Sequence, residues 1–453
     1  MDNFFNEYQL ILRMALTSGV PFLPSGFYHH YPPKFTHKDR INFLRGCHRG
    51  FERAQNSILD LICKINIDAS LNQQEKEFRS LLLRKVLDAI VYTIFSEQLH
   101  VLRRFVLHNF PPHLNIDEAK KLLMIANKYN AESRQIFAIV SDLTTCVHVG
   151  DIVLIDHRGR PKIELIEIKS GAVNTILTDF LDHFENSNKV LNSLKECPAI
   201  PEQFRKQTLR MMKQRIRLSQ VAEVISKEKG VDIKFNKPIS FSKYTYEIDC
   251  FDEFVTDICN RTCQDKIAGG VVDDCIHVCA AIGNSRDDSF LKAHKSIFAC
   301  LKMHRKNNSV IVTNDERLSD WIPRQESIKI FNPILSNLYA CACRPFPLWG
   351  IERENLMKIL SGRLGVAFAF DLSGFIFTAE SLGLNIKFGS KRETDDLIKK
   401  LDRLTVPVWG KRMIKLCASG KEVTLLSGTF SRFINDLVYP SHILQVCKNG
   451  FSK

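Results

Sequence analysis

The sequence predicts a mixed α/β protein built from more than one domain. Its 453 residues are about three times a common domain length of roughly 150, so we expect two or three domains. Segments with helical spacing of apolar residues occur beside short runs rich in β-branched residues, a mixture typical of α/β folds. We expect a helical region at 1–74, an α/β core at 75–228 and an additional mixed α/β region at 229–453, with a further link near 344–350.

The composition indicates a globular protein that stays where it is made. Hydrophobic residues make up 45% of the chain and charged residues 25%, which excludes disorder, collagen-like repeats and coiled-coil rods. The most apolar stretch, 365–377, carries Asp371, and we expect it to form a hairpin of two short strands, not a membrane span. Because Asp2 and Glu7 stand where a secretory signal needs basic residues, we expect a cytoplasmic protein without a membrane partner.

The charge balance favours a polyanionic partner. Lys and Arg number 63 against 50 Asp and Glu, which gives a formal net charge of +13. An excess of that size favours nucleic acid or an anionic membrane face over a basic ligand. The balance alone does not choose between these two partners.

The cysteines predict reduced thiols, since 14 of them occur without an export signal. The densest group consists of Cys259, Cys263, Cys275 and Cys279. A zinc or iron–sulfur site would need such thiolates to converge on one ion. A spacing of four residues also places two cysteines on one face of a helix, where free cysteines are common core residues. We therefore expect buried core thiols in preference to zinc.

Helical periodicity dominates the first third of the chain. It extends over 37–65, 75–108 and 116–130. We expect 75–108 to be one long helix, ended by the prolines at 111–112. Glu97 falls on the apolar face of this helix, between Ile94 and Val101. A carboxylate on a buried face is costly unless something pairs with it, so Glu97 is a candidate functional residue.

After residue 130 the spacing of apolar residues is no longer helical. Short β-rich runs separated by polar turns predict strands at 135–142, 150–156 and 162–169. Helices are expected behind them at 174–194 and 203–225. The third run is apolar on both sides, as in a strand that is covered on both faces.

The candidate chemistry lies on the hairpin formed by the second and third runs. The turn at 157–162 folds Asp151 alongside Glu167 and Lys169 at the open end. Glu167 and Lys169 are two residues apart and therefore share a face of the sheet. Asp151 joins that face only if paired residue numbers have an even sum, as with Asp151 opposite Glu167. That register requires a connecting loop of odd length.

If the register holds, two carboxylates and one ammonium group meet on a single face. Two carboxylates with open oxygen positions suit Mg²⁺, with Mn²⁺ as a substitute, because this ion also takes waters and a substrate phosphate. The metal would polarise a phosphoryl oxygen and activate a water. Lys169 would position or deprotonate that water and stabilise the charge growing on phosphorus. Glu97 is a candidate third carboxylate. The alternative is a solvated strand face whose ion pairs contribute little.

The order of these motifs resembles that of the PD-(D/E)xK nuclease superfamily. A helix that bears Glu comes first, Gly-Asp then precedes a strand, and a Glu-x-Lys strand is followed by Ser-Gly. The resemblance covers about residues 80–220 and implies the restriction-endonuclease-like fold. It implies that Asp151 and Glu167 bind the metal and that Lys169 is the catalytic lysine. Glu97 matches the helical Glu of that family only loosely. Gly150, not proline, precedes the first acid.

The helix at 203–225 could bind the phosphates of nucleic acid. Six cations precede its first acid, Glu223: Arg205, Lys206, Arg210, Lys213, Arg215 and Arg217. Neutralisation of phosphates by such a row does not depend on base sequence. Related folds often carry Gln or Lys near the site on this helix, a role that Gln207 or Gln214 could match. The alternative is a solvated basic face.

These features predict a metal-dependent nuclease that acts on DNA. Family analogy extends the prediction to bacterial anti-phage defence or DNA repair. Two alternatives stay open: a non-catalytic nucleic-acid-binding or structural subunit with the same fold, and a zinc-binding scaffold protein. Residues 229–453 contain no Walker, GxSxG, HExxH or GxGxxG motif. We expect this region to serve recognition, regulation, or assembly with a second copy or a partner protein.

Overall fold

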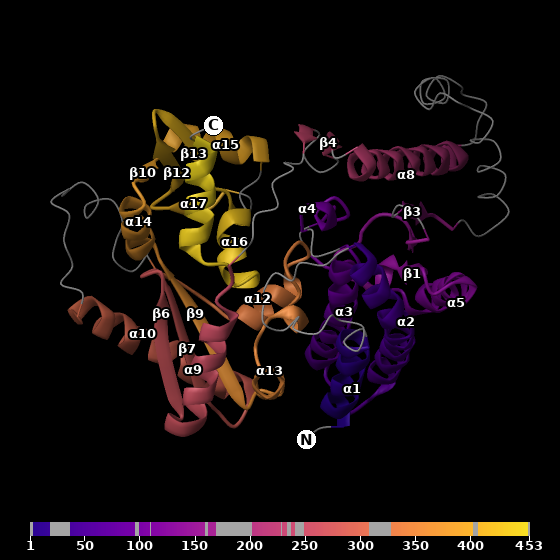
Figure 1. Cartoon of the computed structure of the whole chain (residues 1–453), viewed down its shortest axis with the longest axis horizontal. Helices are drawn as coiled ribbons and strands as arrows, with labels where there is room; N and C mark the ends of the chain where they lie inside the picture. The colour runs from indigo at the N-terminus through magenta and orange to yellow at the C-terminus, as the bar shows by residue number, and fades with distance from the viewer. Residues whose placement is uncertain are drawn as a thin grey trace. The chain divides into compact units, whose positions relative to one another are not determined.

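The computed structural model describes residues 3–18, 37–95, 99–108, 110–158, 162–168, 202–227, 229–232, 237–240, 249–307, 328–401 and 406–451. Contacts divide the chain into two compact units (Figure 1). We call residues 10–243 the N-terminal unit, and residues 1–9 with 244–453 the C-terminal unit. Both units combine helices with antiparallel sheets, so the predicted mixed α/β class is confirmed. Within the described ranges, no helix is both long and apolar enough to cross a membrane.

The N-terminal unit contains a three-stranded antiparallel sheet flanked by helices. Its helices are α2 (His37–Ile67), α3 (Gln73–Ile94), α4 (Leu99–Leu102), α5 (Ile116–Glu132) and α8 (Glu202–Lys227), and α1 (Asn3–Thr17) spans the division between the units. Its strands are β1 (Ile136–Val140), β2 (Ile152–Asp156), β3 (Lys162–Ile166), β4 (Lys229–Asp232) and β5 (Lys237–Ser240). The strands β1, β2 and β3 pair in that order, and β4 pairs with β5. The three strands predicted before residue 170 are therefore confirmed, as are the helices predicted at 37–65, 116–130 and 203–225.

Helices α2 and α5 cover the outer edge of β1. An edge strand has one row of backbone N–H and C=O groups without a strand partner. Gln55 of α2 donates to the carbonyl of Ala138 at 3.2 Å and accepts from the N–H of Val140 at 3.0 Å. Asn130 of α5 accepts from the N–H of Ala138 at 2.7 Å. These amide side chains stand in for a fourth strand, which allows β1 to be buried along its whole length.

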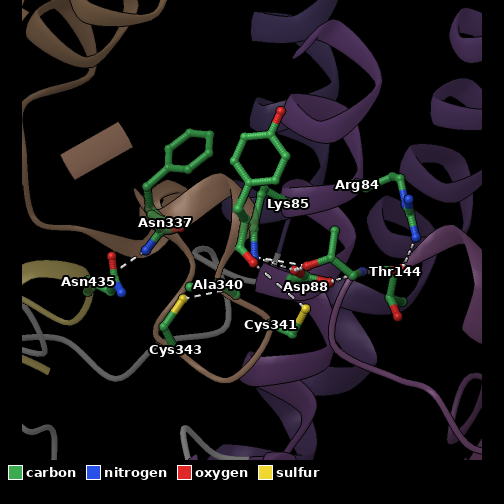
Figure 2. Close-up of polar contacts among 12 residues, drawn as sticks. Arg84, Lys85, Asp88, Thr144, Asn337, Ala340, Cys341, Cys343 and Asn435 are labelled. Atoms are coloured by element: carbon green, nitrogen blue, oxygen red, sulfur yellow. Dashed lines mark hydrogen bonds and ion pairs between the residues drawn. The ribbon is translucent and has the colours of Figure 1, made fainter. Parts of the chain in front are cut away.

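Helix α3 is buried on both its apolar and its charged side. Lys85 and Asp88 are each 1% exposed, and Lys85 Nζ lies 2.9 Å from Asp88 Oδ2 (Figure 2). Asp88 also accepts hydrogen bonds from the backbone N–H and the hydroxyl of Thr145. Burial alone would raise the pKa of Asp88, but Lys85 and Thr145 hold that pKa below its ordinary value. Asp88 is therefore an ionised, fully partnered carboxylate inside the unit.

Arg84 holds the same part of the chain. Its guanidinium donates to the carbonyl oxygens of Thr144 at 2.6 Å and Asp142 at 3.2 Å (Figure 2). It also donates to the carbonyl of Pro112 at 2.9 Å. Together with the Lys85–Asp88 pair, these bonds attach α3 to residues 141–151, which connect β1 to β2. We call these residues the β1–β2 loop.

The expectation of one long helix over 75–108 is wrong. Helix α3 ends at Ile94, and only the short α4 follows it within the described residues of that range. The stretch 90–95 is made of β-branched and aromatic residues, which are weak helix formers. Within it, the Thr93 hydroxyl donates to the carbonyl of Ala89 at 2.9 Å, a bond that competes with regular helix geometry.

The C-terminal unit contains two four-stranded antiparallel sheets. Its helices are α9 (Asp252–Asp265), α10 (Arg286–Asn307), α12 (Pro333–Tyr339), α13 (Arg353–Leu360), α14 (Leu372–Ser381), α15 (Lys391–Leu401), α16 (Ser427–Asn435) and α17 (Pro440–Phe451). Its strands are β6 (Ile267–Val272), β7 (Ile276–Ile282), β8 (Ile328–Phe331), β9 (Leu364–Asp371), β10 (Asn385–Phe388), β11 (Val408–Trp409), β12 (Arg412–Ala418) and β13 (Lys421–Thr424). One sheet has the order β6-β7-β9-β8, and in the other β12 pairs with β10, β11 and β13.

The predicted hairpin at 365–377 is a strand followed by a helix, β9 and α14. The carboxylate of Asp371 accepts from the N–H of Ser373 at 2.9 Å and so caps the start of α14. The Asp-Leu-Ser-Gly stretch therefore begins a helix, and the predicted hairpin is wrong.

Helix α10 packs closely on the first of these sheets because the contact is made of small residues. The fully buried cluster between them consists of Cys279, Ala281, Ala293, Ile297, Ala367 and Ala369. The segment 344–350 also lies inside this unit. Phe346 and Trp349 are buried, and Arg344 Nη1 lies 2.8 Å from Asp252 Oδ2.

The buried Lys85–Asp88 pair leads to a stability prediction. Lys85→Met should lower the free energy of unfolding by about 3–5 kcal/mol, because it leaves the Asp88 carboxylate buried without its counter-ion. The double variant Lys85→Met/Asp88→Asn should be more stable than Lys85→Met, since no uncompensated charge remains. Urea unfolding of the wild type and both variants measures the effect. A loss within about 0.5 kcal/mol, as for a surface residue, would show that the pair is not buried in solution.

Candidate active site

The register between β2 and β3 brings the two predicted acids to one end of the hairpin. Ile152 pairs with Ile166, so paired residue numbers have an even sum, and the connecting loop at 157–161 has odd length. The regular pairing ends with Ile152 opposite Ile166; Asp151 directly precedes β2 and Glu167 directly follows β3. The even sum that a shared site requires therefore holds within the paired strands.

Two hydrogen bonds fix Asp151 beside Glu167. The backbone N–H of Asp151 donates to the carbonyl of Ile166 at 2.8 Å. Asp151 Oδ2 accepts from the backbone N–H of Ile168 at 2.6 Å. These two partners flank Glu167 in the chain, and both acidic residues are half-buried. Asp151 is thus held against the end of β3 by both its backbone and its carboxylate.

Gly150 has a conformation that proline cannot adopt. Its φ of +75° is in the left-handed region, whereas the proline ring fixes φ near −65°. A Cβ at this position would also lie 3.3 Å from the carbonyl oxygen of Ile166. The departure from the family motif at Gly150 therefore has a local structural cause.

Asp142 is a third acid at this end of the sheet, and no motif in the sequence marks it. It lies in the short 3₁₀ helix after β1, and the residue before it donates its N–H to the carbonyl of Asp151 at 2.9 Å. Burial raises the pKa of Asp142, Arg84 opposes that rise, and the negative charges of Glu118 and then Glu167 add to it. Asp142 ends the first β-rich run, and an antiparallel meander brings that end beside the start of the second strand.

The other predicted catalytic residues, Glu97 and Lys169, lie outside the described residues. Among the described residues, no group of three or more His, Cys, Asp and Glu side chains could hold a metal ion. The Asp151–Glu167 pair alone still has the donor chemistry that Mg²⁺ uses, because this ion keeps several waters and often takes only one or two carboxylates. It is not a donor set for zinc, which prefers nitrogen and sulfur ligands.

His148, within the β1–β2 loop, attaches this loop to residues 107 and 108. Its Nδ1 accepts from the backbone N–H groups of Leu107 and His108, both at 3.0 Å. Its Nε2 lies 2.9 Å from the carbonyl oxygen of Thr145. These bonds need a neutral ring with its proton on Nε2. Burial lowers the pKa of His148 to about 4, so the ring is neutral at physiological pH.

Helix α8 places a row of cations on its exposed face. The exposed cations are Lys206, Arg210, Lys213 and Arg217, which recur every three or four residues. Gln214 and Arg215 are half-buried, and the side chain of Arg205 lies outside the described part of the structure. The inner face carries the buried residues Thr208, Met211 and Met212. Of the predicted phosphate-binding residues, four cations form the exposed row, and Gln214 is half-buried.

The inner face of α8 also reaches the start of β2. A Cβ at Gly150 would lie 3.5 Å from Leu218 Cδ2, so this leucine contacts the turn before Asp151. Gln214 is four residues earlier, on the same side of the helix. Gln207 and Gln214, the two glutamines named for a role near the acids, are both half-buried.

The four clustered cysteines do not form a common site in the described part of the chain. Cys259, Cys275 and Cys279 are buried, and Cys263 is exposed. None belongs to a group of described side chains that could hold a metal ion. Burial raises the pKa of Cys259 to about 12 and that of Cys275 well above its ordinary value. Both are therefore protonated thiols at neutral pH.

A pocket with an open volume of about 310 Å³ lies at the other end of β2, away from the acids. Its lining combines Phe51 and Phe137 with Arg134 and His157. Six residues of extended strand separate His157 from Asp151, which corresponds to about 20 Å. The acidic residues are thus at the opposite end of β2 from this pocket.

Comparison of the chain with protein-family models, with curated proteins and with solved structures found no match in any of the three. The function of the acidic site therefore has to be inferred from its own residues.

The neutral His148 leads to a prediction on pH. Its pKa of about 4 in the folded state is below the ordinary value of 6.5, so the unfolded chain binds the proton first. Stability is then lost as the pH falls from 6.5 towards 4, with a contribution of about 2 kcal/mol by about pH 5. His148→Gln should be less stable than the wild type near neutral pH but should lose less stability on acidification. Urea unfolding of both proteins near neutral pH and at about pH 5 measures this difference. An equal loss of stability in both proteins would show that His148 is not a source of the pH dependence.

Proposed function

We propose that the protein is a metal-dependent nuclease of the PD-(D/E)xK type that cleaves DNA. The observation that carries this proposal is the contact at the end of the hairpin, where Asp151 Oδ2 accepts from the backbone N–H of Ile168, the residue after Glu167. The order of elements supports a restriction-endonuclease-like core, because α5 precedes the meander β1-β2-β3 and α8 follows it. In this proposal the N-terminal unit is catalytic.

Each acidic residue has a specific role in the proposed reaction. Asp151 and Glu167 would bind Mg²⁺, or Mn²⁺ in its place, and the bound ion would polarise the scissile phosphoryl oxygen and lower the pKa of a water. The bond from Ile168 N–H to Asp151 Oδ2 fixes the position of this carboxylate at the end of β3. Lys169, the next residue after Ile168, would orient the attacking water and stabilise negative charge on phosphorus.

Asp142 adjusts the charge of the proposed site. Its raised pKa reflects burial first, and then the negative charges of Glu118 and Glu167. A divalent cation between the acids would remove part of this repulsion, since a metal ion is the largest local charge in such a site. In this proposal, Asp142 would add negative charge near the two metal-binding acids.

The choice of nucleic acid as substrate rests on charge. The formal net charge is +13, and four exposed cations lie on one face of α8, in the same unit as the acids. The row from Lys206 to Arg217 extends about 16 Å along the helix at 1.5 Å per residue. A row of this length could contact several phosphates of one strand.

The catalytic proposal predicts loss of cleavage in three variants. Asp151→Asn, Glu167→Gln and Lys169→Ala should each reduce Mg²⁺-dependent cleavage of DNA by about 10²-fold or more. The physical reason is that the first two remove a metal ligand and the third removes the group that positions the water. Gel assays on linear and circular, single- and double-stranded DNA, with RNA alongside, measure the rate and identify the substrate.

A matched control lies on the same hairpin. Glu164→Gln removes an exposed acid of β3 that pairs with Lys162 near the turn, and it should leave cleavage unchanged. Equal cleavage by the wild type and all three site variants would remove the catalytic claim. Nucleic-acid binding without cleavage by the wild type would instead favour the non-catalytic subunit.

The α8 row predicts a salt-dependent contribution to affinity. Arg210→Ala/Arg217→Ala should weaken DNA binding and lower the slope of log K against log salt by about 2, because each lost phosphate contact removes about 0.9 from it. Lys399→Ala/Lys400→Ala removes two exposed cations from α15 and should leave the slope unchanged. Fluorescence anisotropy at several salt concentrations measures the affinity and the slope for the two double variants. Equal slopes for the two double variants would remove α8 from the interface.

A further inference from the structure

Two thiols of the C-terminal unit are in contact. Cys279 of β7 donates a hydrogen bond to Cys300 of α10, with 3.3 Å between the sulfur atoms. Cys279 is fully buried, whereas Cys300 is partly exposed. A disulfide bond is about 2.05 Å long, so its formation would require the two sulfurs to approach only a little further.

The neighbouring strand provides the space for this contact. Gly269 of β6 pairs directly with Cys279 in the ladder between β6 and β7. A Cβ at Gly269 would lie 2.5 Å from Cys300 Sγ and 2.9 Å from Cys279 Sγ, closer than real atoms approach. A side chain at position 269 would therefore displace a sulfur, and glycine at this position allows the two thiols to meet.

The surroundings make the two thiols chemically unequal. The hydrogen bond from Cys279 lowers the pKa of Cys300 to about 7, burial opposes this shift and the positive charge of Arg261 adds to it. The same hydrogen bond, followed by burial, raises the pKa of Cys279. Arg261 Nη2 lies 3.5 Å from the carbonyl oxygen of Gly269, on the strand beside the sulfurs. Cys300 is thus both the thiol that ionises more readily and the one that solvent reaches.

We propose that Cys279 and Cys300 are a reversible redox pair that reacts with peroxides, with Cys300 as the attacking thiol and Cys279 as the resolving thiol. This site lies in the C-terminal unit and does not depend on the proposed nuclease activity. The disulfide would join β7 to α10 covalently, across the cluster of small residues on which that helix packs.

The reaction has two balanced steps. In the first, the Cys300 thiolate attacks one peroxide oxygen; an S–O bond forms, the O–O bond breaks, and the other oxygen leaves as water after taking a proton. In the second, the Cys279 sulfur attacks the sulfenic acid; an S–S bond forms, the S–O bond breaks, and hydroxide leaves with the Cys279 proton as a second water. The two sulfurs together lose two electrons, and hydrogen peroxide gains them. A small dithiol would reverse the oxidation by thiol–disulfide exchange.

Cys263 provides an internal comparison. It is an exposed thiol of the same unit, and Lys358 Nζ lies 3.6 Å from its sulfur. Exposure and a nearby cation alone would direct a peroxide to Cys263. The described structure distinguishes Cys300 by the second sulfur in contact with it.

The test is peptide mapping of the full chain after oxidation. The reduced protein is treated with equimolar hydrogen peroxide, its free thiols are alkylated, and its peptides are identified by mass spectrometry without reduction. We expect a cross-link between the peptides of Cys279 and Cys300 in the wild type and in Cys263→Ser. The cross-link should be absent from Cys279→Ser and Cys300→Ser, and dithiothreitol should reverse it.

Two further variants test the order of the steps and the role of the glycine. In Cys279→Ser, a sulfenic acid on Cys300 should accumulate and react with dimedone, whereas Cys300→Ser should show no such label at Cys279. Gly269→Ala should slow formation of the cross-link, because its Cβ displaces a sulfur. The proposal is overturned if Cys263 is oxidised in the wild type while both paired thiols stay reduced. Oxidation of Cys300 to sulfinic acid without joining Cys279 would overturn it equally.

Discussion

A shift of one residue between β2 and β3 would send Asp151 and Glu167 to opposite faces of the sheet, because side chains alternate along a strand. The candidate site therefore depends on the parity of this register. The odd-length loop at 157–161 sets the parity at one end of the hairpin. At the other end, the bonds from Asp151 to Ile166 and Ile168 hold the two chains together. The left-handed Gly150 allows the chain to enter β2 at the angle that these bonds require.

The placement of Asp151 depends in turn on how the β1–β2 loop is held. Arg84, Lys85 and Asp88 of α3 bind this loop, and His148 within the loop attaches it to His108. Burial of three charged side chains is expensive, and it is tolerable here because each makes several hydrogen bonds. Side chains that fix a loop in this way restrict the geometry of the acids it carries, which is what a catalytic site requires.

The sequence predicted most of the elements around the site because their periodicity is strong. Strands β1 to β3 and helix α8 have clear apolar patterns, and Asp151 and Glu167 stand at predictable positions on them. The sequence could state the register condition but could not decide it, because loop length depends on where pairing stops. Asp142 was missed since it follows a strand without any motif of its own, and only the meander brings it to the acids.

Other features depend on tertiary contacts that a periodic pattern does not contain. The stripe of α3 correctly predicted its apolar face, but the burial of Lys85 and Asp88 follows from packing on both sides. The end of α3 at Ile94 lacks the usual glycine or proline signal. Cys300 is distant from the cysteine cluster in sequence, and the packing of α10 on the sheet is what brings it to Cys279.

The claim that Asp151 and Glu167 share a divalent cation can be tested directly by crystallography. Crystals grown or soaked with Mn²⁺, a substitute for Mg²⁺ that scatters anomalously, would show its position without any assumption about activity. The account predicts an anomalous peak within coordination distance of one oxygen from each of the two carboxylates, and no such peak in crystals of Asp151→Asn. Carboxylates on opposite sides of the sheet, or a peak bound elsewhere with these two acids unligated, would contradict it.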